Sequence, residues 1–250
     1  MNTPEQTYEQ TDVLVRGARV RMRVTGAGDP LLLLNGLTRP LESWKPFTES
    51  LPGRTVISFD APGVGGSPTP ILPLSIPKLA GLAASILDEA GIDKADVLGY
   101  SHGGAVAQQL AVLAPSRVRR LVLVSTSCGL GATPGGRGAL RGLLPSTAAS
   151  SWPPPDAIGA LWHFLAIAGW SSIPILGAIQ AQTLVVCGER DRVVPPANSK
   201  LLARRIPGAV LTMLPAGHDL QRSSPARHLA RVVESFLAAG HVAKPQPVGT

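Results

Sequence analysis

The sequence has little charge and few cysteines. Charged residues make up 16% of the 250 residues and hydrophobic residues make up 44%, a balance that excludes a disordered chain and a coiled coil. The two cysteines, Cys128 and Cys187, each lie in or just after an apolar run. We therefore expect buried, reduced thiols and a reducing compartment rather than a disulfide. A chain of this length predicts one or two domains.

Long basic tracts and an apolar leader are also missing. Basic residues outnumber acidic ones by 23 to 16, but they occur in small groups without interleaved aromatic residues, so nucleic-acid binding is not expected. Residues 1–12 lack the apolar segment of a secretory signal, which predicts a cytoplasmic protein. Residues 157–179 contain no charged residue and could cross a bilayer by length. Because serines, a proline and three glycines interrupt this stretch, we expect an apolar lid and no transmembrane segment.

Short apolar runs alternate with helical periodicity along most of the chain. The expected strands are residues 13–24 as a hairpin, 31–34, 55–59, 96–99, 121–124, 183–187 and 209–214. The expected helices are residues 75–90, a segment from Ser101 onward, 198–206 and 225–239. This alternation predicts an α/β protein whose mostly parallel central sheet has helices on both faces.

The alternation is interrupted once. Residues 129–182 are first rich in Gly, Pro and Ala and then apolar, which predicts a short cap or lid insertion. The core would then comprise residues 1–128 and 183–240. Residues 241–250 are expected to form a flexible tail.

One local motif predicts a nucleophile. Residues 99–103 read G-x-S-x-G, with an expected strand leading into Ser101 and an expected helix leaving it. This strand, tight turn and helix arrangement exposes a serine above a sheet. Gly99 and Gly103 have a steric role, because side chains there would clash in so tight a turn. The helix N-terminus would also direct free N–H groups toward charge that develops at the serine.

A serine hydroxyl needs a base to remove its proton, and the base needs a group that orients it. Asp191 and His218 each follow a separate expected strand, so Ser101, Asp191 and His218 are predicted to meet at the carboxyl edge of the sheet. Alone, Asp191 could be a turn-capping aspartate and His218 a loop histidine. Together with the serine motif they predict a catalytic triad, with Glu189 as the alternative acid.

An oxyanion hole needs two fixed N–H donors. We expect the backbone N–H groups of His102 and Leu37, the latter in the loop after residues 31–34. The His102 imidazole is expected to be a bystander. His163, His228 and His241 lack metal-ligand spacing and are expected to be structural or solvated. The predicted chemistry requires no metal and no organic cofactor.

Aromatic residues are the candidates for lining an apolar acyl pocket, although most of them could equally belong to the core. Trp162 and Trp170 are the candidate substrate-binding residues. The whole candidate set is Trp44, Phe47, Trp152, Trp162, Phe164 and Trp170.

These motifs together resemble the α/β-hydrolase superfamily over residues 13–239. The stretches FDAPGVGGSPTP, ADVLGYSHGGAVAQQLA, AGWSSI and QTLVVCGERDRVVP are similar to the intracellular medium-chain poly(3-hydroxyalkanoate) depolymerases. The resemblance implies ester hydrolysis with Ser101 as nucleophile, Asp191 as acid and His218 as base. The sequence departs from that family at His102, where the family usually has Trp, and in the shorter, Gly/Pro-rich residues 129–162.

We therefore expect a carboxylic ester hydrolase that acts on apolar, medium-chain (hydroxy)acyl substrates, with poly(3-hydroxyalkanoate) or its oligomers among them. The same triad would serve a lactonase, a thioesterase or cyclase, or a carbon–carbon bond hydrolase. A slow-turnover ligand-binding protein on the same fold is a further alternative. Docking to a polymer granule or a lipid surface through residues 157–179 could accompany hydrolysis.

Overall fold

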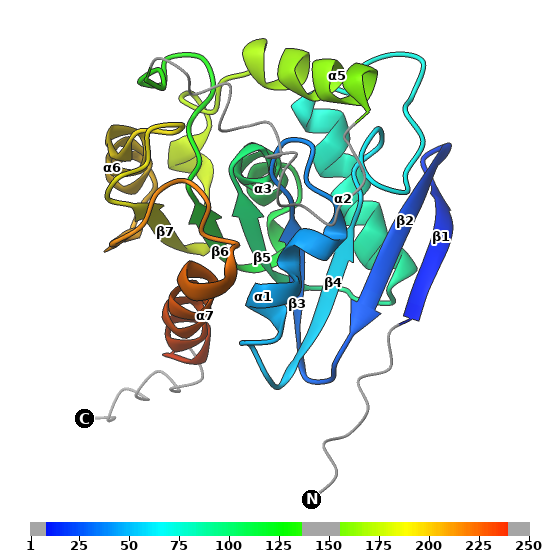
Figure 1. Cartoon of the computed structure of the whole chain (residues 1–250), viewed down its shortest axis with the longest axis horizontal. Coiled ribbons are helices and arrows are strands. Elements are labelled where there is room, and N and C mark those ends of the chain that lie inside the picture. The colour runs from blue at the N-terminus through cyan, green and yellow to red at the C-terminus, as the bar shows by residue number, and fades with distance from the viewer. Residues whose placement is uncertain (1–8, 137–155, 240–250) are drawn as a thin grey trace, which may run out of the picture.

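The computed structural model describes residues 9–136 and 156–239. Within these residues a single sheet has the strand order β1-β2-β4-β3-β5-β6-β7-β8 (Figure 1). The pairs β1–β2 and β2–β4 are antiparallel and the other neighbours are parallel. The strands are β1 (Glu9–Val15), β2 (Ala18–Thr25), β3 (Asp29–Leu34), β4 (Arg54–Phe59), β5 (Ala95–Tyr100), β6 (Val118–Val124), β7 (Gln182–Gly188) and β8 (Val210–Leu214).

Helices cover both faces of the sheet, so the predicted α/β architecture is confirmed. One apolar cluster joins the sheet to α2 (Ile76–Glu89), α3 (His102–Leu113) and α6 (Pro196–Arg205). A second cluster, on the other face, joins it to α1 (Lys45–Thr48) and α7 (Ser223–Ala238). The remaining elements are α5 (Ala157–Ala168) and the short 3-10 turns η1 (Leu41–Trp44), η2 (Pro115–Arg117) and η3 (Leu176–Ala178).

Burial explains why the strands could be recognised from continuous apolar runs. Every residue of β5 is buried, because helices cover a parallel strand on both faces and leave no solvent side. The β1–β2 hairpin differs, since it lies at the edge. Its turn uses Arg16 and Gly17, both with positive φ (50° and 77°), as two-residue hairpin turns require.

The expected cap is described over residues 129–136 and 156–182. Its helix α5 lies above the carboxyl ends of the parallel strands (Figure 1). Asp156 caps this helix by accepting the N–H of Gly159 at 2.7 Å. A Cβ atom added at Gly159 would lie 2.1 Å from the carbonyl oxygen of Gly63, so α5 packs backbone against backbone on the loop after β4.

Residues 137–155, with Trp152, and the expected tail 241–250 lie outside the described residues. The division of the chain into core, cap and tail therefore stays a prediction. No helix in the part of the chain that the structure describes is long and apolar enough to span a membrane.

A buried ion cluster joins the amino-terminal ends of three neighbouring strands. Asp96 at the start of β5 is fully buried and accepts hydrogen bonds from Arg54 of β4 and Arg119 of β6 at distances of 2.7 to 3.1 Å. Arg54 also pairs with Glu234 of α7 at 3.0 Å. Buried charges require such partners. The cluster therefore holds the amino-terminal ends of β4, β5 and β6 in register, at the edge opposite the carboxyl ends.

Candidate active site

Ser101 occupies the strained turn between β5 and α3. Its backbone has φ of 51° and ψ of −117°, a conformation that a residue with a side chain rarely adopts. The Ser101 N–H donates to the carbonyl of Val124 at 2.8 Å, and its carbonyl accepts from the hydroxyl of Thr126 at 2.7 Å. The strand, turn and helix predicted around Ser101 are therefore present, and two contacts, one with the last residue of β6 and one with the loop after it, hold the turn in place.

The glycines beside Ser101 have the steric role expected from the sequence. A Cβ atom at Gly103 would lie 2.2 Å from the carbonyl oxygen of Leu34. One at Gly99 would lie 2.4 Å from the carbonyl oxygen of Gly103. No real Cβ atom approaches an oxygen so closely, so larger residues would push α3 away from the end of β3.

The structure brings Ser101, His218 and Asp191 together. His218 Nε2 lies 3.2 Å from Ser101 Oγ, and His218 Nδ1 lies 2.8 Å from Asp191 Oδ2. The other carboxylate oxygen, Oδ1, accepts the N–H groups of Val193 and Val194 at 2.9 and 2.8 Å. Because a carboxylate only accepts, neutral His218 carries its proton on Nδ1 and presents the lone pair of Nε2 to the serine.

The loop after β3 lies directly against this serine. A Cβ atom at Gly36 would approach the Tyr100 ring to 2.8 Å and Ser101 Cβ to 3.4 Å. The loop turns at once, since the N–H of Arg39 donates to the carbonyl of Gly36 at 3.2 Å.

Two N–H groups are available beside the serine. Within the described residues the Leu37 N–H has no protein acceptor. His102 opens α3, so its N–H belongs to the first turn, which lacks intrahelical partners. Both groups are thus without an acceptor in the part of the chain that the structure describes, and their expected role as oxyanion donors stays a prediction.

Side-chain bonds join the loop after β3 to the loop that carries His218. The amide nitrogen of Gln221 donates to Asn35 Oδ1 at 2.9 Å. Arg39 pairs with Asp219 at 3.2 Å, and its guanidinium lies 5.6 Å from the centroid of the Tyr100 ring. These contacts fix the loop that carries His218 relative to the loop after β3. Glu189, the alternative acid, is exposed, and it takes no part in the contacts between Ser101, His218 and Asp191.

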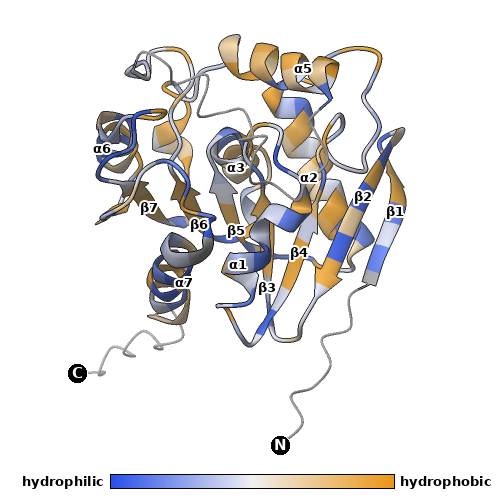
Figure 2. Cartoon of the chain, viewed as in Figure 1, coloured by the Kyte–Doolittle hydropathy of each residue, from blue (hydrophilic) through white to orange (hydrophobic). Residues whose placement is uncertain are grey.

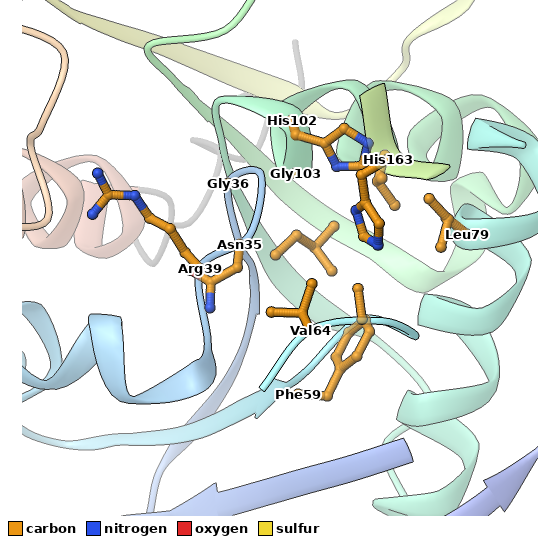
Figure 3. A pocket seen from close by; sticks show the side chains of 12 residues that line it. Asn35, Gly36, Arg39, Phe59, Val64, Leu79, His102, Gly103 and His163 are labelled. Atoms are coloured by element: carbon orange, nitrogen blue, oxygen red, sulfur yellow. The ribbon is translucent and has the colours of Figure 1, made fainter. Parts of the chain in front are cut away.

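A cavity of about 20 Å³ lies beside the start of α3. Its wall is apolar except for Asn35, Arg39, His102 and His163 (Figure 3). The apolar lining comes from the ends of β3 and β4 and from helices α2 and α3, and includes Leu34, Phe59, Ala61, Val64, Leu79 and Val106. The His102 side chain, expected to be a bystander, is therefore part of the cavity wall.

Sequence reasoning did not foresee the position of His163. Helix α5 places this side chain against His102, with ring centroids 4.9 Å apart at an angle of 44°. His163 Nε2 lies 2.9 Å from the carbonyl oxygen of Pro62. Burial lowers the pKa of both histidines, and for His102 the neighbouring His163 lowers the pKa further. Both rings are therefore neutral near pH 7, and no linear spacing could have revealed this pair.

Trp162 and Trp170 line two other cavities and do not line the one beside His102. Trp162 lines a space of about 10 Å³ and donates to the carbonyl of Pro70 at 3.0 Å. Trp170 lines an open groove of about 390 Å³ and donates to Gln109 at 3.0 Å. His163 and Leu79 line both the cavity at His102 and the space at Trp162, so these two cavities adjoin.

The remaining aromatic candidates lie elsewhere. Trp44 and Phe47 belong to the apolar core on the α7 face of the sheet, which is one of the two positions that the sequence left open for them. Both were apolar enough for either role, and only the packing of η1 and α1 against α7 decides between the two. Phe164 is exposed on the outer side of α5.

Metal and thiol chemistry receive no support from the geometry. No group of three His, Cys, Asp or Glu side chains in residues 9–136 and 156–239 could hold a metal ion. Cys128 and Cys187 are buried and unpaired, and burial raises the pKa of each thiol, which makes both poor nucleophiles.

Comparisons with known proteins agree with this fold. Residues 29–144 match a family model described as alpha/beta hydrolase fold, and residues 170–248 match one described as TAP-like protein. The chain is 37% identical to the poly(3-hydroxyalkanoate) depolymerase of Ectopseudomonas oleovorans, over 83% of this chain and 84% of that protein. It is 31% identical to a 2-hydroxymuconate semialdehyde hydrolase of Pseudomonas putida, over 95% and 98% of the two chains.

Among solved structures, a hydrolase from Pseudomonas aeruginosa PA01 superimposes with a TM-score of 0.78 at 28% identity, covering 94% of this chain and 99% of that one. The protein therefore belongs to the α/β-hydrolase family and is a hydrolase. The resemblance to poly(3-hydroxyalkanoate) depolymerases that the sequence motifs indicated is confirmed.

Proposed function

We propose that the protein is a serine hydrolase that cleaves carboxylic esters of apolar, medium-chain (hydroxy)acyl groups. The observation that carries this proposal is the continuous contact from Asp191 through His218 to Ser101 Oγ. Such a chain activates a serine hydroxyl as a nucleophile. In this proposal the backbone N–H groups of Leu37 and His102 supply the oxyanion site.

In the proposed mechanism His218 Nε2 takes the proton of Ser101 Oγ, which attacks the ester carbonyl carbon. Leu37 and His102 stabilise the negative oxygen, and the protonated His218 gives its proton to the departing alcohol. Water, deprotonated by His218, then attacks the acyl-serine and releases the acid. Asp191 holds His218 in the tautomer that this sequence of steps requires. No step needs a metal or an organic cofactor.

The apolar cavity lining and one relative support the substrate class. Six aliphatic and aromatic side chains line the space beside His102, among them Phe59 and Leu79, and such walls suit an alkyl chain. The relative named poly(3-hydroxyalkanoate) depolymerase supports that polymer or its oligomers as a substrate. The relative named 2-hydroxymuconate semialdehyde hydrolase keeps carbon–carbon bond cleavage by the same triad as the second candidate.

The test is hydrolysis of p-nitrophenyl esters from acetate to dodecanoate by the wild-type protein and by Ser101→Ala. We expect a maximum at medium chains and a loss of roughly 10⁴-fold or more in the variant. Ser85 lies on α2 and accepts an exposed hydrogen bond from Arg16 of the β1–β2 turn. Ser85→Ala is therefore the matched control and should keep wild-type rates. A wild type as inert as Ser101→Ala on every ester would contradict the proposal, and lactones, thioesters and ring-cleavage products would be tried next.

We also propose that the outer side of α5 docks on a polymer granule. Figure 2 shows this helix as a largely hydrophobic surface element. Its exposed apolar residues include Leu161, 50% exposed, and Phe164, while Ile71 in the loop beside Trp162 is 94% exposed. Solvent-exposed apolar patches of this kind mark interaction surfaces.

Sedimentation with polyester granules tests this docking. Leu161→Asp and Phe164→Asp should reduce the bound fraction, whereas Leu113→Asp, at a 54% exposed leucine of α3, should not. Ile167 of the same helix is left unchanged, because it packs against the core and a charge there would also disturb that packing. Equal binding of all three variants would refute the docking proposal, and binding to phosphatidylcholine vesicles but not to granules would replace the granule by a lipid surface.

A further inference from the structure

Two buried imidazole nitrogens beside the serine have no protein partner. His102 and His163 are 7% and 4% exposed. Within the described residues, His102 Nε2 and His163 Nδ1 are buried atoms that make no hydrogen bond. Buried polar atoms in folded proteins almost always have a partner. Both histidines line the same cavity, so a bound water or a hydroxyl group of a ligand there would supply the missing partners.

The contacts of His163 define which kind of partner it needs. Its Nε2 lies 2.9 Å from the carbonyl oxygen of Pro62, and a carbonyl can only accept, so Nε2 carries a proton. Burial lowers the pKa of this histidine, so the ring is neutral and holds one proton only. His163 Nδ1 therefore presents a lone pair. An ester, keto or carboxylate oxygen cannot satisfy it, whereas an O–H group can.

The position of this lone pair relates it to the acyl part of a substrate. His102 directly follows Ser101, its N–H is an oxyanion donor, and its ring lies against His163 (Figure 3). The same cavity is lined by Gly36 of the loop after β3 and by apolar side chains such as Phe59. An acyl group attached to Ser101 would thus meet apolar walls and these two imidazole rings.

We propose that His102 and His163 bind a free hydroxyl group on the acyl chain of the substrate. The hydroxyl donates to His163 Nδ1 and accepts from His102 when Nε2 of that ring carries the proton. This inference rests on the proposed ester hydrolysis and restricts its preferred substrates. The acyl units inside a polyester have no free hydroxyl, because that oxygen is esterified, so the pair selects terminal or single hydroxyacyl units over internal ones.

The experiment compares kcat/KM for three p-nitrophenyl esters of equal chain length: octanoate, hydroxyoctanoate and methoxyoctanoate, the last two substituted at carbon 2 or carbon 3. The methoxy group accepts hydrogen bonds but cannot donate one. We expect the hydroxy ester to exceed the plain ester by about tenfold or more at one of the two positions. The methoxy ester should gain nothing over the plain ester.

The variant His163→Phe keeps a flat ring and removes the acceptor. The ratio of hydroxy to plain ester should fall to about one in this variant, and this ratio is the readout whatever the overall rate. His228→Phe, at an exposed position on α7, is the matched control and should keep the wild-type ratio. A purely structural role of His163 in holding α5 would lower both rates and leave the ratio unchanged, which would overturn the inference.

A second measurement needs no variant. Free hydroxyoctanoate should inhibit the wild-type protein at least about tenfold more tightly than octanoate, and equal inhibition contradicts the inference. The two proposals fail differently. Hydrolysis of all three esters with equal efficiency, abolished in Ser101→Ala, overturns only the role of the histidine pair. Absence of ester hydrolysis in the wild type overturns the proposed function as well.

Discussion

Replacing Asp191 by Asn tests the proposed triad with little change of shape. Asp191 Oδ1 accepts two backbone N–H groups, from Val193 and Val194, whereas Oδ2 faces His218 Nδ1 at 2.8 Å. In Asp191→Asn the single amide oxygen remains with the two backbone donors. The amide N–H₂ group then faces His218, so the His218 proton must move from Nδ1 to Nε2, the atom that faces Ser101.

The magnitude follows from this exchange of tautomers. A His218 protonated on Nε2 has no lone pair for the Ser101 proton, and the variant also lacks the negative charge that stabilises the imidazolium. We expect kcat to fall by about 10⁴-fold, which corresponds to about 5.5 kcal/mol of transition-state stabilisation. Because the buried amide keeps its hydrogen bonds, Tm should change by roughly 5 °C or less.

The assay is p-nitrophenyl octanoate hydrolysis at pH 7 to 8, together with thermal unfolding of the same samples. Glu189→Gln is the matched control, since Glu189 follows the same strand and is exposed. It should keep kcat within about twofold. If Asp191→Asn lost less than about tenfold while Glu189→Gln lost most of the activity, the assignment of Asp191 as the orienting acid would be refuted.

Three further predictions concern stability and the loop after β3. Burial lowers the pKa of His102 and His163 below the ordinary 6.5, so unfolding takes up protons below that pH. The free energy of unfolding should therefore fall by about 1.4 kcal/mol per pH unit for each histidine as the pH drops below 6.5. In urea titrations, the free energy of unfolding of His163→Phe should depend less steeply on pH than that of the wild-type protein. Asp60→Ala removes a fully buried carboxylate that binds an arginine and two backbone N–H groups and should cost about 3–5 kcal/mol in urea unfolding; a cost below 1 kcal/mol would contradict the contacts. Gly36→Ala drives a methyl group into an aromatic ring of β5 and should lower kcat by about 10²–10³-fold, whereas Gly177→Ala, with open space around it, should leave kcat unchanged.

Local patterns in the sequence were sufficient for the sheet and the turn at Ser101. Buried parallel strands such as β5 leave continuous apolar runs, and the tight turn requires glycine at residues 99 and 103 for steric reasons that any chain would share. Asp191 and His218 could be predicted to approach Ser101 because parallel strands bring their carboxyl ends to one edge. Their contact distances and the exposure of Glu189 came from the structure.

The sequence by itself determined most of the strands and helices, because backbone periodicity and glycine sterics are local properties; it did not predict the helices α1 and α5. It did not determine what each apolar or polar side chain contacts. Trp44 and Trp162 are equally apolar in the sequence, yet one lies in the core behind the sheet and the other in a cavity beneath α5. The contact between His102 and His163 arises only when α5 packs on the loop after β4, and such a contact between distant segments depends on tertiary packing alone.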